Sequence, residues 1–157
     1  MNYPPLATIS QHFPSEKLQD VPGRLRAELD NCGVKIKPGG RIAVAVGSRG
    51  IANTEIMVRE VVAWVKARDG VPFIVPAMGS HGGATAAGQA EVLAGYGITQ
   101  ERVGAPIVSS MDVVSLPQGN VEVPVYLDKA AAAADGTILI NRTKPHTSFH
   151  ARYESGL

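Results

Sequence analysis

The feature that most constrains the fold of this chain is a set of three short apolar runs, each followed at once by a polar loop. The runs are residues 41–47 (RIAVAVG), 71–78 (VPFIVPAM) and 136–141 (GTILIN). Short runs with almost no polar residues are typical of strands buried on both faces, as in parallel sheets. The sequence therefore predicts a sheet that is covered on both sides.

Helix signals separate these runs. Asp20 is a candidate N-cap with Pro22 in the first turn, Gly33 ends that helix, and Asn53 is the candidate cap of the next. Strands that alternate with helices favour parallel pairing with helices on both faces. We therefore expect an α/β fold, a three-layer sandwich with a largely parallel Rossmann-like sheet. The expected helices cover about 20–33, 53–69, 85–97 and 128–134.

Further strands are expected in the second half of the chain. The candidates are residues 106–109, 112–116 and 121–127, the last two joined by a turn over 117–120. Pro72 and Pro76 are awkward in a central strand, so we expect them to mark the ends of the 71–78 run.

The domain organisation is expected to be simple. Residues 1–20 predict an extended N-terminal arm, and residues 21–157 predict a single α/β domain. The last residues form a polar, motif-like segment with no helix after it. We expect the chain to be the N-terminal part of a longer two-domain enzyme.

Composition excludes several classes of partner. The formal net charge is +1 and there is no long basic run, so we expect no nucleic-acid binding. No apolar run is long enough to span a bilayer, and the first residues do not form a signal peptide. The single cysteine, Cys32, excludes an intramolecular disulfide and a cysteine zinc site. We expect a cytoplasmic protein.

The three loops after the apolar runs carry the chemistry. They are residues 47–53 (GSRGIAN), 79–85 (GSHGGAT) and 141–147 (NRTKPHT). Ligands of open α/β sheets bind beyond the carboxyl ends of the strands, so parallel neighbouring strands would bring the loops to one edge. The side chains that would meet there are Arg49, His81, Lys144 and His146.

Each loop also has a structural explanation. Arg49 is either a clamp for a carboxylate or a solvated side chain in a tight turn. His81, flanked by glycine, favours function because an exposed imidazole exchanges protons near neutral pH. Pro145 stiffens the backbone before His146. His150 would share a face with His146 only on a helix, which nothing in the sequence requires.

Together the loops resemble the N-terminal domain of the nickel-pincer-dependent lactate racemase family. The residues that carry the resemblance are 47–50 (GSRG), 78–85 (MGSHGGAT), 141–147 (NRTKPHT) and 153–157 (YESGL). It covers the chain from about residue 40 onward. Dinucleotide, Walker and hydrolase-elbow motifs are absent.

The resemblance implies racemisation or epimerisation of a 2-hydroxy acid by hydride transfer to a nickel pincer nucleotide. It implies that His81 and His146 are the catalytic acid and base, and that Arg49 and Ser48 bind the substrate. The residues expected to bind the cofactor are Gly79, Ser80, Gly82 and Lys144.

The resemblance also implies what this chain lacks. The lysine that tethers the cofactor and the histidine that ligates nickel would lie beyond Leu157, and Lys144 does not match the tethering position. No metal ligand is therefore expected within the chain, and this piece alone should racemise nothing. The family's acid ahead of the arginine is replaced by Val46, which leaves the identity of the 2-hydroxy acid open.

Two other classes of function remain open. The glycine loops and Arg49 could bind a small anion or a phosphate without catalysis. Alternatively, an exposed edge of the sheet could pair with another chain, which includes formation of a homo-oligomer.

Overall fold

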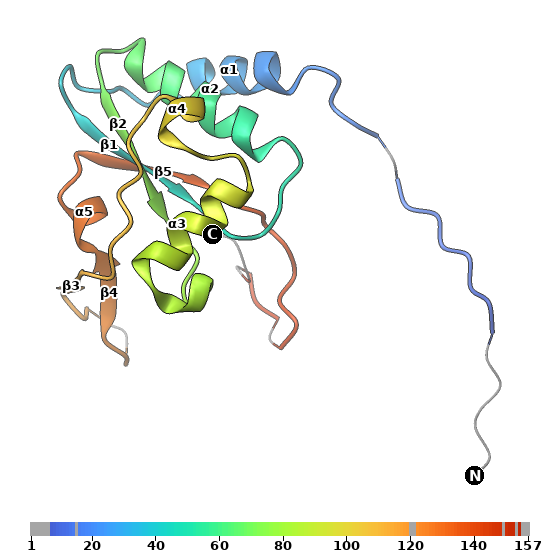
Figure 1. The fold of residues 1–157 in the computed structure, drawn as a ribbon. Helices are drawn as coiled ribbons and strands as arrows, with labels where there is room; N and C mark the ends of the chain where they lie inside the picture. Colours follow the sequence, from blue (N-terminus) through green and yellow to red (C-terminus); the bar gives the residue numbers. More distant parts are fainter. Residues whose placement is uncertain (1–6, 15, 120–121, 149, 153, 155–157) are drawn as a thin grey trace.

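The structure is a computed structural model that describes residues 7–14, 16–119, 122–148, 150–152 and 154 (Figure 1). It is an α/β fold with a three-stranded parallel sheet in the order β2-β1-β5 and a separate antiparallel hairpin, β3–β4. The elements are α1 (Val21–Asn31), β1 (Arg41–Val46), α2 (Thr54–Lys66), β2 (Val71–Pro76), the 3-10 helix η1 (Gly82–Ala84), α3 (Ala86–Gly95), α4 (Gln100–Val103), β3 (Val113–Leu116), β4 (Val125–Asp128), α5 (Lys129–Ala132) and β5 (Gly136–Ile140).

The central strand β1 pairs in parallel with β2 on one side and with β5 on the other. Side chains alternate along a strand, so Val44 and Val46 face one side of the sheet while Ala43 and Ala45 face the other. All four are buried, as the apolar run predicts. The prediction of a largely parallel sheet with both faces covered is confirmed.

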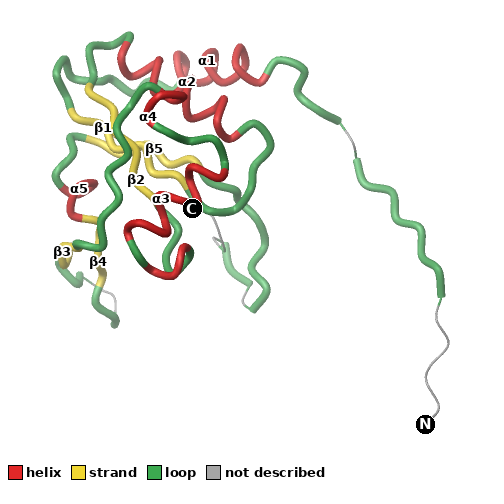
Figure 2. The backbone as a smooth tube through the Cα atoms, viewed as in Figure 1, coloured by secondary structure: helices red, strands yellow, loops and turns green. Residues whose placement is uncertain are grey.

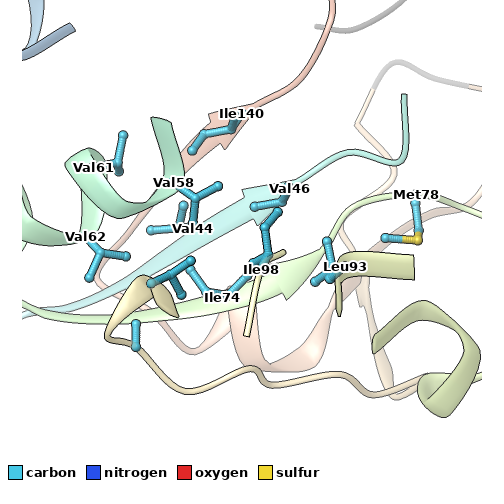
Figure 3. Close-up of a cluster of buried hydrophobic side chains, with 12 residues drawn as sticks. Val44, Val46, Val58, Val61, Val62, Ile74, Met78, Leu93, Ile98 and Ile140 are labelled. Atoms are coloured by element: carbon cyan, nitrogen blue, oxygen red, sulfur yellow. The ribbon is translucent and has the colours of Figure 1, made fainter. Parts of the chain in front are cut away.

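The larger core lies on the face of Val44 and Val46 (Figure 3). Helix α2 packs on it, and Leu93 of α3 and Ile98 after that helix extend it toward β2. Its members, mostly β-branched, are Val44, Val46, Val58, Val61, Val62, Ile74, Met78, Leu93, Ile98, Val103, Ala105 and Ile140.

The smaller core lies on the opposite face of the sheet. Ala131 of α5 packs there against Ala43, Ala45, Phe73 and Val75. Helix α5 and the β3–β4 hairpin therefore lie across the sheet from α1 and α2 (Figure 1).

The helix starts follow the sequence signals with one difference. The Asp20 carboxylate accepts a hydrogen bond from the Gly23 N–H at 2.8 Å, and Thr85 caps α3 by accepting from the Gly88 N–H at 3.1 Å. Asn53 precedes α2 as expected but does not cap it with its side chain. Its backbone is left-handed, with φ of 63°, and its side chain makes no capping hydrogen bond.

The prolines of β2 correct one prediction. Pro76 ends the strand, but Pro72 lies inside it, at the second position. The Val71 N–H donates to the carbonyl of Gly40, just before β1, and the Ala77 N–H donates to the carbonyl of Val46, at the end of β1. The N–H of Ile74 points away from β1 and donates to the Pro106 carbonyl. Pro72 and Pro76 share the orientation of Ile74, so neither interrupts the pairing with β1.

The second half of the chain contains less strand than expected. Residues 106–109 form no strand and meet the sheet only at a parallel bridge between Ile107 and Ile74. Strand β4 begins at Val125, later than the predicted 121–127, and residues 120 and 121 lie outside the described part. Helix α4 is an addition that the sequence did not predict.

The described part of the segment before α1 leads away from the body of the molecule (Figure 1). Its described residues form no helix or strand, and its large apolar side chains Ile9, Phe13 and Leu18 are exposed. Every helix in the described part of the chain is too short or too polar to cross a lipid bilayer.

Replacing Leu93 by alanine should lower the free energy of unfolding by about 2–5 kcal/mol, because the change removes most of a fully buried side chain and leaves a cavity in its place. Chemical denaturation would measure the loss. Leu18→Ala is the matched control, because Leu18 is 67% exposed and its truncation should change stability by less than about 0.5 kcal/mol. Equal effects of the two substitutions would contradict this description of the core.

Candidate functional site

The carboxyl ends of β2, β1 and β5 lie side by side, and the three predicted loops leave the sheet there (Figure 2). Backbone hydrogen bonds tie the starts of the loops together. The Gly47 N–H donates to the Ile140 carbonyl at 3.0 Å, and the Ala77 N–H donates to the Val46 carbonyl at 2.8 Å. The parallel order of neighbouring strands, on which the convergence of the loops depends, is therefore present.

Two of the loops meet through side chains. The Ser48 hydroxyl lies 2.5 Å from Nδ1 of His81, a hydrogen-bonding distance. Ser48 is half-buried and His81 is exposed. The Tyr96 hydroxyl, just after α3, donates to the Ser48 carbonyl at 2.5 Å. The loop after β1 is thus linked both to the His81 loop and to the end of α3.

The His81 loop is fastened to α3 by backbone contact. Gly82 and Gly88 approach so closely that a Cβ on Gly88 would overlap the Gly82 carbonyl, and a Cβ on Gly82 would lie 2.5 Å from a backbone atom of Gly88. Gly82 also has a φ of 65°. This packing gives Gly82 a structural role, while its predicted role in binding a cofactor stays a prediction.

A buried polar side chain adds a second attachment. Gln89 is 5% exposed, and its amide nitrogen donates to the Gly79 carbonyl at 2.8 Å. Gly79 and Ser80 themselves are exposed on the outer side of the loop. The loop therefore presents His81, Gly79 and Ser80 to solvent while its inner side is held by α3.

Arg49 follows Ser48 and is exposed. Its guanidinium forms no hydrogen bond or ion pair with the residues that the structure describes. It is free to pair with an anion that arrives at this edge.

The third loop carries Lys144 and His146, both half-buried. The His146 backbone N–H donates to Oε2 of Glu154 at 2.6 Å, and the Ser148 N–H donates to Nδ1 of the His146 ring at 3.1 Å. These contacts of His146 lie within its own segment, whereas Ser48 and His81 meet across two loops. Of the YESGL motif at 153–157, only Glu154 is among the described residues. Residue 149, ahead of the motif, also lies outside them.

Glu154 organises the backbone around His146. Its carboxylate accepts from the N–H groups of His146 and Ala151, and it lies 3.6 Å from Nδ1 of His150. The hydrogen bond from the His146 N–H is the largest cause that holds the pKa of Glu154 below its ordinary value. Glu154 is therefore an anchor for this loop.

The structure contains no prepared metal site among the residues it describes. No group of three or more His, Cys, Asp or Glu side chains is placed to hold an ion there. The described residues around His146 and His150 are not helical, so the two rings do not share a helix face.

Sequence reasoning missed two residues of this site, Tyr96 and Gln89, and gave no role of its own to Glu154, which lies in the YESGL motif. Gln89 lies one helical turn before buried Leu93, so its position on the buried face of α3 could have been noticed. Tyr96 reaches Ser48 across 48 positions, and no local pattern indicates such a contact.

Compared with models of protein families, with curated proteins and with solved structures, the chain gives no significant match. The family resemblance of the three loops therefore rests on their own residues.

Gly88→Ala should destabilise the fold by about 1–3 kcal/mol and shift the amide resonances of residues 79–85, because the new methyl group overlaps the Gly82 carbonyl. Gly95→Ala is the matched control in the same helix. Nothing lies within 4 Å of a Cβ on Gly95, so that change should be neutral or stabilise by up to about 1 kcal/mol. Thermal unfolding and amide spectra measure both, and a harmless Gly88→Ala would exclude the tight contact.

Acidification should release the His146 loop. Because the pKa of Glu154 is lowered in the folded chain, its contacts contribute stability above the ordinary value of 4.5 and lose it as the pH falls through the lowered pKa. The amide resonances of His146 and Ala151 should therefore titrate together with a midpoint below 4.5. Glu154→Gln, which keeps an acceptor oxygen but cannot ionise, should abolish that titration. A midpoint above 4.5 would show that these hydrogen bonds do not form.

Proposed function

We propose that this chain is the N-terminal catalytic domain of a lactate racemase-like isomerase that racemises or epimerises a 2-hydroxy acid, with hydride transfer to a nickel pincer nucleotide. The observation that supports it best is the contact between Ser48 and His81 at the edge where β1 and β2 end. It joins the two loops whose residues, by the resemblance, bind the substrate and exchange its proton.

Arg49 and Ser48 are suited to hold the substrate. The guanidinium of Arg49, which pairs with none of the residues that the structure describes, matches a carboxylate, which every 2-hydroxy acid carries. Ser48 adjoins it and adds a hydroxyl that already reaches His81.

The two histidines are suited to move the proton of that hydroxyl. His81 is exposed at the sheet edge, and its imidazole can accept the proton when the α-carbon is oxidised and return it afterwards. In the proposed reaction His146 acts on the opposite side of the substrate, and the two rings exchange the roles of base and acid between the enantiomers. The parallel strand order, which places both loops at the same edge of the sheet, supports this division of roles.

The cofactor fits this chain only in part. Exposed Gly79 and Ser80, after β2, offer backbone and hydroxyl groups to a nucleotide-like ligand, and Lys144 lies on the loop that follows β5 at the same edge of the sheet. The described residues provide no cluster of metal ligands, so nickel would be ligated from elsewhere in the enzyme. When bound, the pincer group would supply hydride acceptance from the α-carbon and hydride return.

A phosphate-binding module without catalysis is the competing function. The glycine-rich loop that precedes α3, with Gly79, Gly82 and Gly83 all at positive φ, is the observation in its favour, because such turns expose backbone N–H groups. Both functions need Arg49, and they differ in the role of the histidines.

Binding of 2-hydroxy acids tests the proposal. Calorimetry with both enantiomers of lactate and of larger 2-hydroxy acids should show comparable affinity for the two hands of one acid, and inorganic phosphate should compete poorly. Arg49→Gln should weaken binding roughly 10–100-fold, because it removes a charge-assisted pair. Arg59→Gln, a change on the solvent-exposed face of α2, is the matched control and should bind normally. Tight phosphate binding with no binding of hydroxy acids would establish the competing module.

Turnover separates the two functions further. In the longer two-domain enzyme of the proposal, supplied with the pincer nucleotide, His81→Asn and His146→Asn should abolish interconversion of the enantiomers while changing affinity little. Chiral chromatography measures the interconversion. Histidine substitutions that act only through affinity would contradict a catalytic role.

A further inference from the structure

The partner of His81 determines which atom of its ring can act. Ser48 Oγ, from the loop after β1, lies 2.5 Å from Nδ1 and occupies that nitrogen. No residue that the structure describes forms a hydrogen bond with Nε2, so Nε2 is the nitrogen left to meet a ligand. We propose that Ser48 is a positioning residue, which holds the His81 ring with Nε2 as its proton-exchanging atom. The contact stands by itself, while its use in proton exchange rests on the proposed function.

The hydroxyl group suits a ring that must change its protonation. A serine hydroxyl donates to Nδ1 when the proton of the neutral ring is on Nε2, and it accepts from Nδ1 when the proton is there instead. It also accepts from the doubly protonated ring. The same contact therefore survives whether Nε2 of His81 is about to take a proton or to give one.

The rest of the loop keeps this contact in place from both sides. The Tyr96 hydroxyl holds the Ser48 carbonyl, and Gln89 holds the carbonyl of Gly79, two residues before His81. Both holders belong to α3 or to the residue after it. Ser48 and His81 are thus positioned against the same helix although they follow different strands.

His146 shows the contrast. Its Nδ1 accepts a hydrogen bond from the backbone N–H of Ser148, and a backbone N–H can only donate. In the neutral His146 ring this contact favours the proton on Nε2. The Ser48 hydroxyl can pair with either neutral form of His81, so the two rings differ in what the partner of Nδ1 admits.

Ring nitrogen resonances of ¹⁵N-histidine test this without any enzymatic assay. At a pH where the rings are neutral, His146 should show the form protonated on Nε2 alone. Nδ1 of His81 should show a hydrogen-bonded shift that differs from that of His12, an exposed histidine that serves as the internal reference. Ser48→Ala should move the His81 shifts to those of His12, and Ser48→Thr, which keeps the hydroxyl, should restore them.

Further variants control for the fold. Tyr96→Phe should produce a smaller change in the same direction, because it frees the Ser48 backbone but leaves the hydroxyl. Ser115→Ala removes an exposed hydroxyl in β3 and should leave both rings unchanged, and His146 should be unaffected in every variant. Wild-type His81 shifts equal to those of His12 would overturn the proposal even if Ser48→Ala fails to fold, as would unchanged shifts in a folded Ser48→Ala variant.

Activity then distinguishes the two proposals. In the longer two-domain enzyme of the proposal, loaded with the pincer nucleotide, Ser48→Ala should lower kcat about tenfold or more, with rescue by Ser48→Thr. Ring shifts as expected, in a loaded wild-type two-domain enzyme that interconverts no enantiomers, would leave the positioning intact and refute the racemase. If the His81 ring shifts change as expected but wild type and Ser48→Ala racemise equally fast, the role of Ser48 is only structural. That result would overturn its part in catalysis.

Discussion

The parallel pairing of β1 with both of its neighbours is the constraint on which the rest of this structure depends. Because β2-β1-β5 all run the same way, every return must cross a face of the sheet, and those crossings supply the helices that bury Val44 on one side and Ala43 on the other. The same direction brings three carboxyl ends to one edge. Core and candidate site are therefore two consequences of one arrangement.

Helix α3 holds the loops at that edge of the sheet in place. The contact of Gly82 with Gly88, the Gln89 amide and the Tyr96 hydroxyl all join loops to this helix or to the residue that follows it. Leu93 anchors the helix itself in the main core. Exposed His81 is thus attached, through few intermediates, to the main hydrophobic core, and such attachment is what a preorganised group requires.

The strands and caps were predictable because their causes are local. Apolar runs of six to eight residues locate β1, β2 and β5, and Asp20 caps α1, as the sequence predicts. The strand expected over 106–109 failed because its apolar residues meet β2 at one bridge only. The pairing of Ser48 with His81 was not predictable, since 33 positions separate the two residues and only the strand order brings them together. Topology predicted the shared edge, but not which side chains would touch across it.

In the family that the loops resemble, an acid stands at the position that Val46 occupies here, and the surroundings of Val46 give that difference a physical meaning. Val46 is fully buried on the α2 face, where a carboxylate would lose its hydration without a partner. The polar contact of His81 comes instead from Ser48, two residues further on, where the chain has left the core. A carboxylate can only accept a hydrogen bond and would favour the protonated ring, whereas a hydroxyl favours neither form. In the proposed reaction, a histidine that must serve both enantiomers benefits from that neutrality, so the missing acid and the Ser48 contact belong to one arrangement.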